Sequence, residues 1–180
     1  MRDKVKKFYD IIKIRSDENE KAFNLLMKEK LYSLVGAIIR MELDSLVRAY
    51  YFNNLSSDSE KEELLDKFIA GEKSFKSDFD MVKELSEKLG WAKHIYFICC
   101  AFIHLSVYHD WANNDKIPNL TLQERQFIVT EFKEQQKAFA YCGYDPSLQL
   151  DINFGFSDLI KIAPAVFGKL KRNLECEIKE

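Results

Sequence analysis

Hydrophobic residues recur every three or four positions along most of this 180-residue chain, which is the spacing of amphipathic helices. The pattern predicts a short opening helix over residues 2–14 and a single long helix over 17–54. The long helix begins with acidic residues and ends at Asn53 and Asn54, a residue type that stops helices well. The first third of the chain is therefore expected to be almost entirely helical.

Four more helices are expected between residues 55 and 143, most of them marked by capping residues and terminal glycines. They are predicted from a Ser59 cap to Gly71, from Asp78 or Asp80 to Gly90, over 91–112, and from Thr121 to Gly143. The clearest start signal is the run T-L-Q-E, because Thr121 and Glu124 have the spacing of a capping box.

Near residue 150 the apolar residues recur with a different period. Apolar residues alternate with polar ones from Leu148 to Phe154, which is the pattern of a strand. A single strand has no partner within the chain, so the segment is expected to lie extended over the helices, or alternatively to pair across the two-fold axis of a dimer. Ser157 is then expected to cap a last helix that Pro164 kinks or interrupts.

These elements predict an all-α, single-domain fold for residues 1–180. About six helices are expected in all, and the parts of the fold are a bundle over 1–142, an extended segment over 143–156 (clearest near 147–155) and a C-terminal helix over 157–180. Only six glycines and three prolines occur in the whole chain, which also favours long helices over many short strands.

Two segments, 31–51 and 91–111, are apolar on nearly all sides, so both are expected at the centre of the bundle. The polar residues within them need partners, because an unpaired buried charge is costly. In the first segment Arg40, Asp44 and Arg48 fall on one face, four residues apart. They predict an ion-pair ladder or, alternatively, an arginine pair that binds a phosphate or carboxylate.

Glu42 projects from the opposite side of the same helix, among apolar residues. It is expected to accept hydrogen bonds in the core, or alternatively to take up a proton. If its partner were a buried cation, Glu42→Gln would cost on the order of 3–5 kcal/mol.

In the second segment, His104 shares its helix face with Tyr108 and Trp111, and His109 lies near the helix end. Ser106 points nearly opposite to His104, which excludes a serine–histidine nucleophile built within this helix. The histidines at 94, 104 and 109 lack the spacing of metal ligands, so neither a metal nor a cofactor is expected. The candidate ligand-binding residues are Arg40, Glu42, Asp44, Arg48, His104, Tyr108, His109 and Trp111, and the catalytic candidates among them are His104, Arg40 and Glu42.

Charge and cysteine content narrow the functional classes. The net charge of −2 provides no basic field for nucleic acid, so nucleic-acid binding is not the expected function. The four cysteines form no C-x-x-C motif and are expected to be reduced, as in the cytoplasm. The longest apolar run, 95–103, is far shorter than the ~20 residues of a membrane span.

The patterns R-x-E-x-D-S-x-x-R and F-I-H-L-S-x-x-H-D stand in the segments 40–51 and 90–111. Through them the chain resembles, over about residues 35–130, a group of bacterial proteins with no assigned activity. More distantly it is similar to the higher eukaryotes and prokaryotes nucleotide-binding (HEPN) domains. Many of these are metal-independent ribonucleases or members of toxin–antitoxin and phage-defence systems.

The HEPN motif places an arginine four to six residues before a histidine on one helix. No arginine precedes His104 at that spacing, so the resemblance implies that Arg40 or Arg48 of the other helix would have to take its place.

The expected function is that of a non-catalytic cytoplasmic helical module that acts through a protein partner or as a homodimer. One alternative is an HEPN-like ribonuclease or nucleotide-binding protein that uses Arg40, Arg48 and His104. Another is a small-molecule site in the polar core, lined by Glu42, His104, Tyr108 and Trp111.

Overall fold

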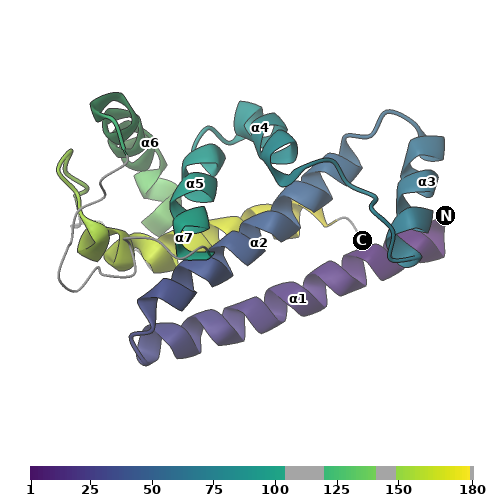
Figure 1. The fold of residues 1–180 in the computed structure, drawn as a ribbon, viewed down its shortest axis with the longest axis horizontal. Helices are drawn as coiled ribbons and strands as arrows, with labels where there is room; N and C mark the ends of the chain where they lie inside the picture. Colours follow the sequence, from purple (N-terminus) through teal and green to yellow (C-terminus); the bar gives the residue numbers. More distant parts are fainter. Residues whose placement is uncertain (104–119, 141–148, 179–180) are drawn as a thin grey trace.

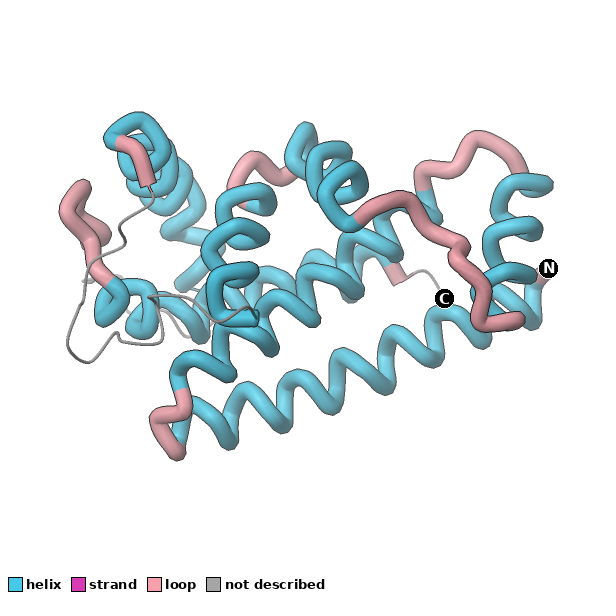
Figure 2. The backbone as a smooth tube through the Cα atoms, in the orientation of Figure 1, coloured by secondary structure: helices cyan, strands magenta, loops and turns pink. Residues whose placement is uncertain are grey.

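A computed structural model describes residues 1–103, 120–140 and 149–178, and these residues form helices and loops without a strand (Figures 1 and 2). Their seven helices are α1 (Arg2–Lys28), α2 (Tyr32–Asn53), α3 (Asp58–Ile69), α4 (Asp78–Lys88), α5 (Ala92–Ile103), α6 (Leu122–Ala140) and α7 (Phe156–Glu177). The predicted all-α helical bundle is confirmed, with seven helices where about six were expected. Within the described residues, every helix is too short or too polar to cross a membrane.

The first two helices are divided differently from the prediction. α1 is continuous for 27 residues, and the chain turns only after it, where Lys30 adopts a left-handed φ of 57°. The expected break near residue 15 is absent because Ser16 and Asn19 lie on the buried face of α1 and continue its stripe with polar side chains. The predicted long helix over 17–54 is wrong for the same reason: its first half belongs to α1 and its second half is α2.

α2 lies at the centre of the molecule, as predicted for 31–51. Figure 1 shows it crossing the middle of the view, with α1 below it, α4 and α5 above it and α7 behind it, and it packs against all four. The described part of the second apolar segment, α5, packs one side on α2 and leaves Phe97 and Ile103 exposed. It is therefore buried on one side rather than all round, and α7 supplies the other long wall of the core.

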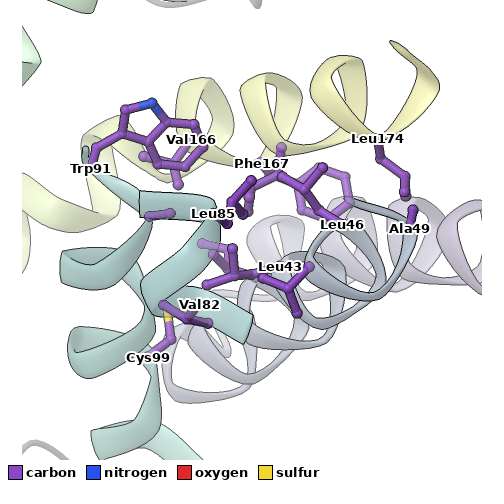
Figure 3. Close-up of a cluster of buried hydrophobic side chains, with 14 of the residues drawn as sticks. Leu43, Leu46, Ala49, Val82, Leu85, Trp91, Cys99, Val166, Phe167 and Leu174 are labelled. Carbon is purple, nitrogen blue, oxygen red and sulfur yellow. The ribbon is translucent and has the colours of Figure 1, made fainter. Parts of the chain in front are cut away.

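The hydrophobic core lies between α2, α4 and α7. Figure 3 shows Leu43 and Leu46 of α2 next to Phe167 and Leu174 of α7 and Leu85 of α4. All five side chains are almost completely buried.

Serine or threonine side chains cap the starts of α3, α4 and α6. Ser57, rather than the predicted Ser59, caps α3 and forms a capping box with Glu60. The predicted capping box of α6 is confirmed: the Thr121 N–H donates to Glu124 Oε2 at 2.8 Å, and the Glu124 N–H donates to Thr121 Oγ1 at 3.3 Å.

The segment before α7 is not a strand within its described part, residues 149–155. Leu150 and Phe154 are buried, so the segment lies over the helices, the arrangement that the sequence favoured. α7 begins one residue earlier than predicted, with the Gly155 N–H donating to Asp158 Oδ2 at 3.1 Å, and it runs on through Pro164 without interruption.

Asn53, the last residue of α2, joins the first and last helices. The Tyr9 hydroxyl of α1 donates to Asn53 Oδ1 at 2.5 Å. Asn53 Nδ2 in turn donates to the backbone oxygen of Glu177 at 2.7 Å and to its Oε2 at 3.0 Å. Lys88 of α4 donates to the other carboxylate oxygen of Glu177 at 2.7 Å. This Asn53 junction therefore holds the ends of α1, α2, α4 and α7 together.

The closest approach of α5 to α2 occurs at Gly36. A β-carbon added there would lie 2.5 Å from Cδ2 and 2.7 Å from Cγ of Phe102. Both atoms are near the root of the Phe102 side chain, so a small rotation does not clear them. We expect Gly36→Ala to lower the free energy of unfolding by about 1–3 kcal/mol in urea titrations, as overpacked core substitutions do.

The double variant Gly36→Ala/Phe102→Ala is the matched control, because truncation of Phe102 at Cβ removes both clashing atoms. Its loss of unfolding free energy should be smaller than the sum of the losses in the two single variants. An unchanged midpoint in Gly36→Ala would contradict the close packing of α5 on α2.

Candidate functional site

Three arginines and two aspartates meet where α2 faces α1 and α4, and we call them the arginine–aspartate cluster: Arg15, Arg40, Asp44, Arg48 and Asp78. Asp44 Oδ2 accepts from Arg15 Nη1 of α1 at 2.8 Å, while Asp44 Oδ1 pairs with Arg48 Nη1 and lies 3.7 Å from Arg40 Nη1. Asp78 at the start of α4 bridges Arg40 at 2.9 Å and Arg48 at 3.0 Å. The predicted ladder along α2 is present, and two more helices contribute to it.

Arg40 is the most enclosed cation of the cluster, with 6% of its surface exposed. Its guanidinium carbon lies 4.3 Å from the centre of the Tyr96 ring. Burial lowers the pKa of Arg40, but hydrogen bonds with Cys100 and Tyr96 and the charge of Asp78 outweigh it, so the pKa is raised. Its Nε atom has no hydrogen-bond partner within the described residues. Arg40 is thus held as a cation between α2, α4 and α5.

The arginine–aspartate cluster has the arrangement of a structural ion-pair network rather than of an open anion-binding site. Burial is the main cause that lowers the pKa of Arg15 and of Arg48, and the other arginines of the cluster contribute in the same direction. Each of the three arginines already pairs with Asp44, Asp78 or both. A phosphate or carboxylate would have to displace these aspartates before it could bind.

Glu42 forms a separate group. Its side chain has no exposed surface, and it accepts hydrogen bonds from Ser16 Oγ at 2.5 Å and from Asn19 Nδ2 at 2.8 Å. The expectation of core hydrogen bonding is confirmed, with neutral donors in place of a cation. Glu42 faces α1 whereas Arg40 faces α4 and α5, so the structure does not bring these two candidates into one cavity.

Four of the predicted site residues, His104, Tyr108, His109 and Trp111, lie outside the described residues. Arg15 and Asp78 were missed because α1 and α4 are separate elements in sequence, and neither residue stands out in a hydrophobic pattern. Nothing in the sequence spacing marks Arg15 as a partner of Asp44, or Asp78 as a partner of Arg40 and Arg48.

Two other reactive side chains of the described part, Cys99 and His94, are affected by burial. Burial raises the pKa of the Cys99 thiol to about 12, which keeps it protonated and unreactive. Burial lowers the pKa of His94, whose ring centre lies 4.5 Å from that of Phe127. Among residues 1–103, 120–140 and 149–178, no three histidine, cysteine or acidic side chains are placed to hold a metal ion.

No protein-family model, curated protein or solved structure matches this chain.

Asp44→Asn should be strongly destabilising, because it leaves buried Arg40 and its two neighbours with Asp78 alone. We expect a loss of about 3 kcal/mol, near the lower end for a broken buried pair because Arg48 is partly exposed. Asp78→Asn is the matched control: its side chain is 38% exposed, so its loss should be about 1 kcal/mol. Equal losses in chemical unfolding would contradict the central place of Asp44.

The Glu42→Gln substitution should destabilise the fold only mildly, because the hydrogen-bond donors to Glu42 are neutral. The substituted amide keeps one acceptor, and the Ser16 hydroxyl can reverse to accept from the new amide group, so we expect a loss of about 1–2 kcal/mol. A loss as large as that of Asp44→Asn in the same unfolding assay would reveal a cationic partner and contradict this hydrogen-bonding scheme.

Proposed function

We propose that this chain is a non-catalytic helical interaction module that works as a homodimer, with α1 as the contact helix. The observation that carries the proposal is a stripe of exposed residues along α1. We call it the α1 stripe: Ile11, Ile14, Glu18, Lys21, Leu25 and Lys28. Their spacing of three, four, three, four and three residues is that of the contact positions of a coiled coil.

The apolar members of the stripe are unusually exposed. Ile14 is 60% and Leu25 is 59% exposed, although each stands on the outer face of a long and regular helix. A 27-residue helix is about 40 Å long, enough for several layers of contact with a second helix. Burial of these side chains against a partner would stabilise the association.

The charges of the stripe select a second copy as the partner. When two α1 helices pair antiparallel about a two-fold axis, Glu18 lies opposite Lys21 of the other copy, and each such pair occurs twice. The same register places Ile14 opposite Leu25 of the other copy. Glu18 and Lys21 form no ion pair within the described residues, whereas their neighbours Asp17 and Glu20 pair with Lys171. The stripe is thus self-complementary at its four central positions, whereas the same register places Ile11 opposite Lys28 of the other copy at its ends.

The polar core favours this proposal over its alternatives. A ribonuclease would need Arg40 or Arg48 free for phosphate, and both are paired with aspartates. A core site for a small molecule would need Glu42 to be reachable, and it has no exposed surface. The described cysteines are free thiols, which is consistent with action in the cytoplasm.

Charge exchange along the stripe tests the proposal. Sedimentation should give about twice the chain mass of 21.2 kDa. Glu18→Lys alone, and Lys21→Glu alone, should each raise the dimer dissociation constant about three- to tenfold, because two attractive pairs become repulsive. The double variant Glu18→Lys/Lys21→Glu restores opposite charges and should recover the wild-type constant.

Circular dichroism of each variant should be unchanged, because the stripe is exposed in the single chain. A monomeric wild-type chain, or a double variant that dimerises no better than the single ones, would overturn the homodimer. Retention of another protein by a wild-type monomer would point to a different partner for the same stripe.

A further inference from the structure

Two small cavities adjoin each other between α5 and α7, at a distance from the arginine–aspartate cluster and from the α1 stripe. One, of about 60 Å³, is closed by α2, and the other, of about 50 Å³, is closed by α6. Five side chains border both cavities: Ile95, Ile98, Leu159, Ile162 and Val166. The two cavities thus share an apolar wall of branched aliphatic side chains, and we call them the α5–α7 cavity pair.

The cavity next to α6 has a polar end. Trp91, His94 and Glu131 are its only lining residues with a side-chain hydrogen-bonding group, and all its other lining residues are apolar. Trp91 is 7% exposed, and its indole nitrogen has no hydrogen-bond partner within the described residues. Figure 3 shows this nitrogen on the side of the ring turned away from Leu85 and Leu43. A buried donor without an acceptor is costly, so a ligand with an accepting group would gain free energy by binding beside Trp91.

We infer that the α5–α7 cavity pair binds a small apolar molecule that carries one neutral hydroxyl group, with the hydroxyl accepting from Trp91 Nε1 and donating to Glu131 or His94. The apolar body would lie between Ile98, Leu159 and the other shared wall residues. This site is independent of the proposed dimer and uses none of the residues of the α1 stripe.

The size and lining define the ligand class. An apolar cavity of about 150 Å³ in a protein core stays dry and takes up benzene. The two cavities together approach that size once a shared side chain such as Ile98 changes rotamer. Burial raises the pKa of Glu131 and lowers that of His94. The other residues that line the cavity next to α6, apart from Trp91, are apolar, so the body of the ligand should be apolar and one hydroxyl group matches the polar end. A single-ring alcohol fits these limits.

Phenol and toluene are suitable probes, since they have nearly the same shape and only phenol can accept from an indole N–H. Titration of the full chain, followed by methyl NMR signals, should show both probes shifting Ile98, Leu159 and Val166. Phenol should bind about three- to tenfold more tightly than toluene, the net gain of its hydrogen bonds. Trp91→Phe should reduce that preference, because the hydroxyl then has only Glu131 or His94 as a partner, and toluene should still bind.

Ile98→Phe fills the shared wall and should abolish binding of both probes. Ile103→Phe, on the exposed side of the same helix, is its matched control and should bind both like wild type. The inference is overturned if neither probe binds, if wild type binds both equally, or if Ile98→Phe still binds. If Trp91→Phe weakened the binding of both probes equally, the role of Trp91 would be purely structural. That result would also overturn the proposed role of the polar end in binding the hydroxyl.

Discussion

A charged side chain on the central helix needs a partner on a neighbouring helix, and this constraint fixes α1 and α4 against α2. Asp44 is matched by Arg15 of α1, and Arg40 is matched by Asp78 of α4. Hydrophobic burial favours any compact arrangement of these helices, because it has no direction. The ion pairs are directional, so they discriminate between arrangements that would bury similar apolar areas.

The sequence pattern was sufficient for the fold class, because helical spacing depends on the local chain alone. It also identified the ladder of Arg40, Asp44 and Arg48, since residues four apart on one helix must be neighbours. It failed at α1, where Ser16 and Asn19 interrupt the apolar pattern without interrupting the helix. These residues are polar because Glu42 needs donors, which is information that only the packed structure contains.

The partners of the candidate site residues could not be predicted for the same reason. Glu42 stood out as an acid on an apolar face, but its donors lie 26 and 23 residues earlier, on another helix. Asp78 looked like an ordinary helix-start residue, and only its position beside α2 makes it a bridge between two arginines. Sequence therefore identified which residues needed partners, whereas the structure identified the partners.

The Asn53 junction has a consequence for the order of folding. Asn53 ends the central helix, yet both acceptors of its amide group belong to Glu177, which is 124 residues later in the chain. During synthesis, α1 and α2 are complete long before this residue exists, and the amide must bond to water until then. The last turn of α7 therefore closes the Asn53 side of the bundle only after residue 177 has been synthesised, and a chain truncated before α7 would leave the Asn53 amide without these acceptors.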